Sequence, residues 1–236
     1  MNRILISIVA CLTFLTLPAE AQKKYFAGAD FNGFLPIGSL NDRFVGTVGG
    51  SVYFGQQRTE NWAWSGRFDI FKFTDINKEK LNKKINVVFN NKSKTYEIPL
   101  NKMEMNLSVY GVAAEGKYKL LQYEKFTSNI NVGFGIYNWK FSRNTYVDSI
   151  FVDTSGTGTI VNIENLNVPK LSQSDWSGGI SLGIEFEYNF INSIAFVLSG
   201  NYKLIIAELW PTLKLDLENV SGLQMFDLRA GFRYRF

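Results

Sequence analysis

The chain has 236 residues, of which 15% are aromatic, 20 are glycine and 5 are proline, and this composition favours a β-rich fold. The formal net charge is +4, and so small and dispersed an excess of positive charge argues against nucleic acid as a partner. No stretch supplies the run of about 20 apolar residues that a membrane-spanning helix needs, which argues against a helical membrane protein.

Residues 1–21 predict a secretory signal peptide. Arg3 gives the start a positive charge, the apolar run Ile4 to Leu17 is too short to span a membrane, and cleavage is expected after Ala21, where a small-x-small pattern ends. The mature chain is then the domain 22–236.

A lipoprotein cleavage box at Ile8 to Cys11 is the alternative, although the apolar run continues past it. If cleavage instead follows Ala21, Cys11 leaves with the signal and the mature chain contains no cysteine. Neither a disulfide nor a thiolate metal site is then possible.

Eight segments of the mature chain alternate apolar residues with small or polar ones, which is the period of a β-strand. The phase changes within the fourth segment, and this predicts a β-bulge near Val109. The eight segments are 23–34, 44–55, 62–73, 105–120, 126–141, 176–190, 194–206 and 226–236.

The connections between these segments alternate in length. Those after the second, fourth and sixth strands are a few residues, whereas 74–104, 142–175 and 207–222 are long. Outer-membrane barrels sort their loops in this way, but a soluble sandwich has no reason to do so. The long connections contain further strand-like pieces, which we expect to form hairpins: 85–89 with 95–100, and 146–152 with 159–163.

The last segment, 226–236, has one apolar face and one face with three arginines and an aspartate. It ends on an aromatic residue and resembles the closing strand of bacterial outer-membrane β-barrels. The resemblance implies that Phe232, Tyr234 and Phe236 form the signal that the barrel assembly machinery reads.

From Tyr25 to Phe236 the chain resembles the small eight-stranded outer-membrane barrels of the OmpA/OmpX type. The alternating pattern, the first loop Pro36 to Gly38 and the terminal Phe236 support this resemblance. It implies an all-β fold, an eight-stranded antiparallel up-and-down transmembrane β-barrel with long extracellular loops. The expected location is the bacterial outer membrane, with outer-membrane lipid around a monomer. A soluble exported sandwich or a lipocalin-like barrel is the alternative.

The polar face of the strands predicts what fills the barrel. An eight-stranded barrel is only wide enough for its own side chains, and unpaired charges there would be costly. We therefore expect an ion-paired polar interior that blocks passage, with a narrow water-filled path as the alternative. The predicted interior charges are Asp30, Arg67, Asp69, Glu115, Lys117, Glu185, Glu187, Lys203, Asp227, Arg229, Arg233 and Arg235.

No catalytic, cofactor-binding or metal-binding residue is predicted. The chain has no histidine, the usual base of barrel hydrolases. The pair Glu185 and Glu187 is interpreted as interior charge balance, and the glycine-rich stretch 154–158 lacks the Gly-Lys-Ser/Thr of a phosphate loop. A surface carboxylate site for a hard cation stays an open alternative.

The favoured function is a non-enzymatic surface protein, in which the barrel is the anchor and the long loops contact a surface protein or ligand. The loop 74–104 is net basic, and the loop 142–175 carries four acids against two cations. The alternative is a narrow passive channel for ions or small, including apolar, solutes, with the apolar patch 209–213 as a cap.

Overall fold

The computed structural model describes residues 24–89, 92–100, 102–153, 160–210 and 219–236. The predicted signal peptide and the stretch 154–158 lie outside these residues. The described residues form twelve strands and a short 3-10 helix, η1, at Gly38–Leu40. The strands are β1 (Lys24–Pro36), β2 (Thr47–Gln57), β3 (Trp62–Phe73), β4 (Asn82–Phe89), β5 (Lys92–Pro99), β6 (Met105–Tyr123), β7 (Phe126–Arg143), β8 (Tyr146–Asp153), β9 (Ile160–Val168), β10 (Leu171–Ile191), β11 (Ile194–Leu209) and β12 (Val220–Arg235).

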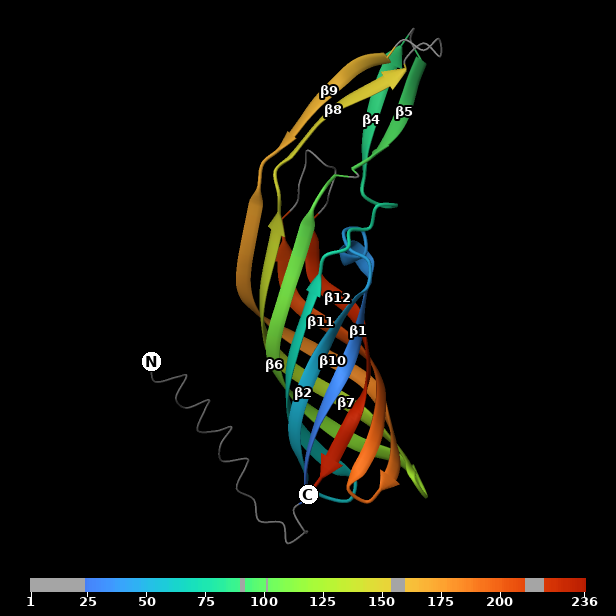
Figure 1. Cartoon of the computed structure of the whole chain (residues 1–236), viewed down its shortest axis with the longest axis vertical. Helices are drawn as coiled ribbons and strands as arrows, with labels where there is room; N and C mark the ends of the chain where they lie inside the picture. Colours follow the sequence, from blue (N-terminus) through green and yellow to red (C-terminus); the bar gives the residue numbers. More distant parts are fainter. Residues whose placement is uncertain (1–23, 90–91, 101, 154–159, 211–218) are drawn as a thin grey trace, which may run out of the picture.

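Eight strands form a closed antiparallel barrel in the order β1-β12-β11-β10-β7-β6-β3-β2 (Figure 1). The first and last strands close it, with Phe26 opposite Arg235 and Pro36 opposite Met225. The prediction of an all-β, eight-stranded up-and-down barrel is confirmed. None of the described helices is long and apolar enough to span a membrane.

The two ends of the barrel differ. The tight turns after β2, β6 and β10 lie at the end where β12 finishes, here called the turn end (Figure 1). At the other end, the loop end, the hairpins β4–β5 and β8–β9 rise far above the barrel. These two hairpins, here called the tower, confirm the expectation of strand pairs within the two longest connections.

The outer wall of the barrel is apolar along most of its height. Alternation along each strand points one set of side chains outward, and large apolar residues among them are exposed on every barrel strand. A soluble protein does not expose such a continuous surface, whereas a lipid-facing barrel requires it. Examples from the eight strands are Phe31, Val52, Phe68, Val112, Phe134, Leu182, Leu198 and Phe232.

Near the loop end the two faces exchange polarity. On β3 the outward residue changes from Ile70 to Lys72, while Phe71 and Phe73 point inward and are buried. Water replaces lipid around this part of the wall, so polar side chains face outward and burial of apolar surface moves to the inside. The strands therefore extend beyond the lipid, and β10 reaches 21 residues where about 10 suffice to cross a bilayer.

This exchange corrects the prediction of a β-bulge near Val109. Inward and outward side chains alternate without interruption from Met105 to Lys117, and the register shift of β6 lies at Lys119/Leu121. The apparent change of phase arises because Met105 and Val109 are apolar and inward, whereas lower on the strand the inward residues are charged. For the same reason Phe44, predicted to begin the second strand, lies outside β2 and is buried.

Glycines make room inside the narrow barrel. A Cβ at Gly111, Gly135 or Gly179 would overlap the ring of Tyr137, so this tyrosine fills space that three strands leave open. Gly231 on β12 is tighter still, because its added Cβ would meet the backbone oxygen of Ala29 on β1.

Gly231→Ala should therefore be strongly destabilising, by about 1–3 kcal/mol or more, because backbone atoms of the closing strand pair cannot move aside. Gly66→Ala is the matched control, since a Cβ at this outward glycine has open space around it. Urea unfolding of both variants in lipid vesicles, followed by the gel shift between folded and heated protein, measures the difference. Equal stabilities would contradict close packing at the β1–β12 pair.

Candidate functional site

The structure places all twelve predicted interior charges inside the barrel, and each of them takes part in an ion pair. Six are cations and six are carboxylates, so the interior set is electrically neutral. We call these twelve residues the charge network. Eleven are almost fully buried; Arg235, at the turn end, keeps 28% of its side chain exposed.

The centre of the charge network joins strands on opposite walls. The Glu115 carboxylate on β6 lies 3.0 Å from Arg67 Nε and 2.8 Å from Arg229 Nη1. Arg229 also reaches Asp227 at 2.7 Å, and Arg67 reaches Asp30 at 2.6 Å. The contacts of Arg229 with Glu115 and Asp227 and of Arg67 with Asp30 are hydrogen bonds, whereas Arg67 Nε meets Glu115 by charge alone. Each charge thus has at least one hydrogen-bonded opposite charge, which is the condition for burying it at acceptable cost.

The lower part of the network lies nearer the turn end. Glu185 pairs with Lys117 at 2.6 Å and with Arg233 at 2.7 Å. Glu187 pairs with Arg233 and Arg235. The two glutamates of β10 therefore serve as partners for cations on β6 and β12, as the charge-balance interpretation of this pair expects.

Lys203 marks the upper limit of the charge network. Its ammonium group lies 2.6 Å from Asp69 and 3.1 Å from Asp227. The same group lies 5.3 Å from the ring centre of Phe34 and 5.4 Å from that of Tyr137, within cation–π range. All ion pairs of the charge network lie at the level of this lysine or below it.

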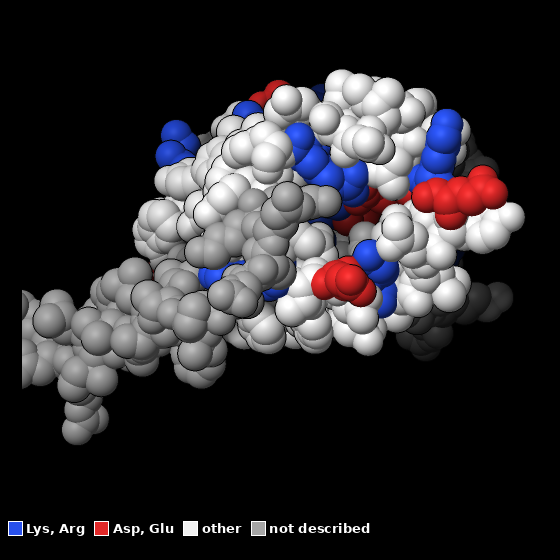
Figure 2. Space-filling model, turned by 90° about the horizontal axis from the view of Figure 1, so that it is seen from below, with Lys and Arg blue, Asp and Glu red and all other residues white. Residues whose placement is uncertain are grey.

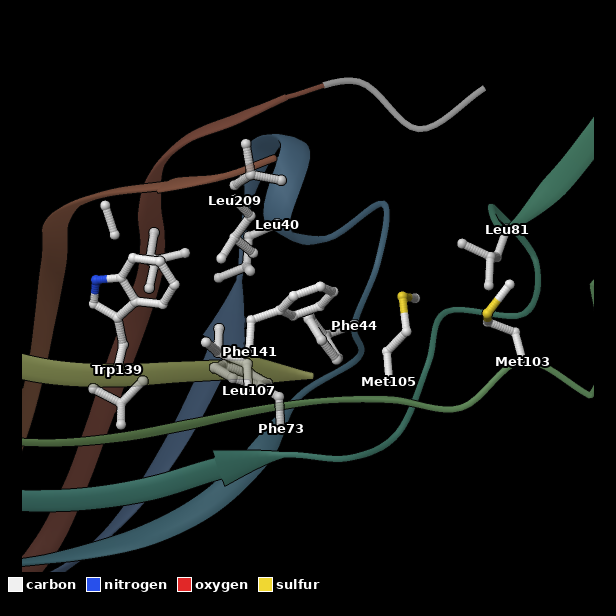
Figure 3. Packing of buried hydrophobic residues seen from close by; sticks show 14 of the residues in the cluster. Leu40, Phe44, Phe73, Leu81, Met103, Met105, Leu107, Trp139, Phe141 and Leu209 are labelled. Atoms are coloured by element: carbon white, nitrogen blue, oxygen red, sulfur yellow. The ribbon is translucent and has the colours of Figure 1, made fainter. Parts of the chain in front are cut away.

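The interior above Lys203 is apolar, which corrects the prediction of a polar interior along the whole barrel. The aromatic rings of Phe44, Phe73 and Phe141 pack together with Leu107, beside Trp139 (Figure 3). We call the buried apolar residues at the loop end the apolar plug. Its residues are Phe34, Leu40, Phe44, Phe71, Phe73, Leu107, Val109, Tyr137, Trp139, Phe141, Ile205, Leu209, Leu223 and Met225.

The apolar plug continues into the tower. Met105, Met103 and Leu81 extend the packed cluster away from the barrel (Figure 3). Ile85 of β4 and Ile150 of β8 belong to the same cluster, so the two hairpins share one hydrophobic core with the barrel.

A buried arginine covers the plug. Arg43, between η1 and β2, places its guanidinium carbon 5.6 Å from the ring centre of Phe141 and donates to the carbonyl of Trp210 at 3.2 Å. Burial, and after it the positive charge of Arg143, lowers the pKa of Arg43 to about 10. No sequence pattern predicts the burial of this residue, because an arginine in a turn-rich loop is typical of the surface.

A wide vestibule opens at the turn end. Its volume is about 1230 Å³, and the lower charges of the network, Lys117, Glu187 and Arg233, line it together with Asn129. The view from below shows the hollow with charged side chains inside it (Figure 2). The interior therefore has a hydrated mouth at one end and the apolar plug at the other.

The predicted assembly residues lie on the outer wall at this mouth. Phe232, Tyr234 and Phe236 are exposed, and Phe236 exchanges backbone hydrogen bonds with Tyr25 at 2.9 and 3.0 Å. The Phe236 ring lies 6.2 Å from that of Tyr25 and 6.1 Å from that of Phe54. The closing strand is thus joined to β1 and β2 by a cluster of aromatic rings.

Comparison with solved structures adds the fold class. A major outer membrane protein from Thermus thermophilus aligns with a TM-score of 0.54 over 92% of this chain and 100% of its own, at 10% identity. Neisserial surface protein A aligns at 0.42 and 12% identity, covering 92% of this chain and 98% of its own. Ail of Yersinia pestis aligns with a TM-score of 0.40 at 14% identity, covering 91% of this chain and 97% of its own. No protein-family model and no curated protein sequence matches the chain.

The chain is a small outer-membrane β-barrel. Its apolar wall requires lipid on all sides, and closure satisfies the backbone hydrogen bonds that lipid cannot. The barrel therefore lies in the bacterial outer membrane. Because such barrels have short periplasmic turns and long outer loops, the turn end faces the periplasm and the tower stands on the cell surface.

Neutral polar residues also line the interior of this outer-membrane barrel, and these were missed in the sequence. Ser51, for example, accepts from Arg67 at 2.6 Å, and Asn129 donates to Glu185 at 3.3 Å. The alternation of β2 and β7 places both residues on the inward face, but the interior predicted from the sequence names charged residues only. Within the described part of the chain, no group of three or more metal-ligating side chains is found.

Proposed function

We propose that the protein is a non-enzymatic outer-membrane anchor that holds a rigid tower on the cell surface for interaction with a surface protein or ligand. The observation that supports this most is the single hydrophobic core of barrel and tower. A loop without a contact function has no need of such a core, and packing makes the tower a fixed platform. The absence of histidine from the sequence removes the usual catalytic base.

The tower offers surfaces suited to contact. Its two hairpins are separate two-stranded sheets, so each strand has one edge without a paired neighbour, and such edges accept an added strand. Large apolar side chains stand outward on both hairpins, namely Val88, Val147 and Phe151. Apolar side chains that remain in water on a packed scaffold favour a protein partner.

Phe151→Glu tests the contact without touching the core. A photoreactive residue at position 151 should crosslink a discrete partner on intact cells. With the photoreactive residue at position 147 instead, the same partner should be captured by the otherwise unaltered chain but not by the Phe151→Glu variant. A photoreactive group at Lys140, outward on β7 below the tower, is the matched control. Equal products from positions 151 and 140 would argue against a contact surface on the tower.

The barrel itself is proposed to be closed to passage along its axis. The neutral charge network and the apolar plug fill the interior one above the other, and an apolar constriction excludes ions. This favours the anchor over the channel alternative.

The refolded chain, residues 22–236, should therefore give no single-channel steps in a planar bilayer after insertion is confirmed by protease protection. The triple variant Phe44→Ala/Phe73→Ala/Phe141→Ala, which removes three rings from the plug, should also give no steps, because the charge network still fills the interior below Lys203. Steps from the unaltered chain would move the channel alternative to first place.

The exposed residues Phe232, Tyr234 and Phe236 are further proposed to be read by the barrel assembly machinery before β12 docks. Their position on the outer wall supports this, because they stay accessible until lipid covers them. Removal of the signal after Ala21 and a monomeric state remain parts of the same proposal, and the mass of the mature protein and its sedimentation in detergent test them.

A further inference from the structure

The barrel wall is not paired along its full height between β10 and β11. Their pairing stops at Gly179 opposite Ile205, although β10 begins at Leu171 and β11 runs to Leu209. Above that point β10 pairs only with β7, and β11 pairs only with β12. We call the opening between residues 171–178 and 206–209 the seam.

A local irregularity explains the seam. The register of β11 with β12 shifts between Ile205 and Glu208, and the facing Gly222 has a φ of +84°, which L side chains adopt only under strain. A bulge of this kind bends its strand. The end of β11 thus stays with β12 and separates from β10.

A cavity of about 960 Å³ lies at the seam. Trp139, Ala207 and Leu204 give it an apolar floor, and Trp210 lies beside it. Hydrogen bonds order the polar residues. One oxygen of Asp175 accepts from Trp176 N at 2.7 Å, and one oxygen of Glu208 accepts from Asn219 Nδ2 at 2.5 Å. Trp139 Nε1 donates to Ser177 at 2.9 Å, and Trp210 N donates across the seam to Gln173 at 3.1 Å. A side chain, rather than a strand ladder, therefore closes the wall here.

The seam opens at the outer surface of the membrane. Trp176, 60% exposed, packs edge-on against Tyr110 at 6.1 Å, and such rings mark the lipid–water interface. Below it the outward residue of β10 is Ile180, and above it is Ser174. The lower part of the cavity is thus at the depth of acyl chains, and its upper part is at the depth of head groups.

The rim has negative charge. Asp175 and Glu208 line the cavity, and the described residues around it include no lysine or arginine. Four described cations are near. Lys140 stands opposite Ser174 and Arg143 opposite Leu171, on the far side of β10. Lys170 directly precedes β10, and Arg43 donates to the Trp210 carbonyl. None of the four lines the cavity, so the rim favours a cationic head group over an anionic one.

We propose that the seam is a binding slot for a single-chain cationic amphiphile, such as a long-chain primary amine. The molecule enters from the lipid, its chain lies on Trp139 and Leu204, and its ammonium group lies between Asp175 and Glu208. This site lies at the wall of the barrel and shares Trp139 with the apolar plug, but it uses no tower hairpin, so it goes beyond the anchor function and does not depend on it.

The five tryptophans of the chain allow a direct test in lipid nanodiscs. The protein is labelled with 5-fluorotryptophan, the five resonances are assigned by substitution, and dodecylamine, dodecanol or dodecanoate is added. Dodecylamine should move the Trp139 and Trp210 resonances in a saturable manner and leave Trp62 and Trp64, on β3 near the turn end, unchanged. Dodecanol should bind more weakly, and dodecanoate weakest of all.

Two variants define the site. Asp175→Asn/Glu208→Gln changes only exposed side chains and should remove the preference for the amine over the alcohol while the alcohol still binds. Ala207→Phe should fill the cavity and abolish saturable shifts, whereas Val48→Phe, outward on β2, should not. The proposal is overturned by equal, unsaturable shifts of all five resonances, by dodecanoate binding as tightly as dodecylamine, or by an amine preference that survives the double variant.

Discussion

Arg229→Ala should cost about 3–5 kcal/mol of the free energy of unfolding, because it removes the buried cation that two buried carboxylates share. The Arg229 guanidinium holds Glu115 at 2.8 Å and Asp227 at 2.7 Å, and all three side chains are almost fully buried. Glu115 keeps Arg67 and Asp227 keeps Lys203, but the charge network then has one excess negative charge. Urea unfolding in lipid vesicles, read by tryptophan fluorescence, measures the loss.

Two controls separate charge from packing. Arg229→Leu/Glu115→Leu removes one charge of each sign and should recover part of the lost stability, since an apolar pair can replace a buried ion pair. Arg235→Ala, at the vestibule where 28% of the side chain is exposed, should cost much less. If Arg229→Ala unfolds at the same urea concentration as the unaltered chain, the charge network does not stabilise the barrel.

Phe141→Ala should have a comparable effect, about 3–5 kcal/mol, but through the apolar plug. The ring is fully buried, meets Phe44 edge-on at 6.4 Å and lies under the Arg43 guanidinium. Its loss leaves a cavity where the barrel interior continues into the tower. The tower should consequently become sensitive to protease added outside the vesicles, while the lipid-covered wall stays protected.

Phe134→Ala is the matched control on the same strand. Phe134 points outward and is 66% exposed on the wall, where lipid chains as apolar as the ring fill the vacated space. Its effect on unfolding should be small and its effect on tower proteolysis absent. Equal proteolysis of the two variants would show that the tower does not depend on the plug.

The lipid-crossing part of the fold was readable from the sequence because its alternation has a chemical cause. Lipid outside and paired charge inside impose opposite residue types on the two faces, so β3 was predicted with its observed bounds, Trp62–Phe73. The tower hairpins were readable for a similar reason, since β4 and β5 each have one face in a core. The alternation of short and long connections then predicts which end of the barrel has the tight turns and which has the long loops.

Above the membrane the same logic failed, because the environment of the two faces is reversed. Met105 and Phe141 are apolar as a lipid-facing residue would be, yet both point inward. Alternation gives the phase of a strand but does not say which phase is inside once lipid is replaced by water. The strands β7 and β10 were consequently predicted too short.

Partner choice within the candidate site also lay beyond the sequence. Glu115 and Arg229 are 114 positions apart, and their contact depends on the diameter of the barrel and the register of every strand between them. The seam has the same origin, since it depends on a bulge between Ile205 and Glu208 that disturbs no local pattern. Long-range register is not encoded in alternation.

The neutrality of the charge network has a consequence for the order of events during folding. β12 contributes three arginines and one aspartate, an excess of two positive charges, whereas the other strands together contribute five carboxylates and three cations. A seven-stranded intermediate therefore has two excess negative charges in its interior, and one edge each of β1 and β11 lacks its partner. Docking of β12 neutralises the interior charge and pairs the open strand edges in a single step. The favourable electrostatic energy of the closed barrel therefore comes only with its own last strand, and a foreign strand without three arginines cannot substitute for it.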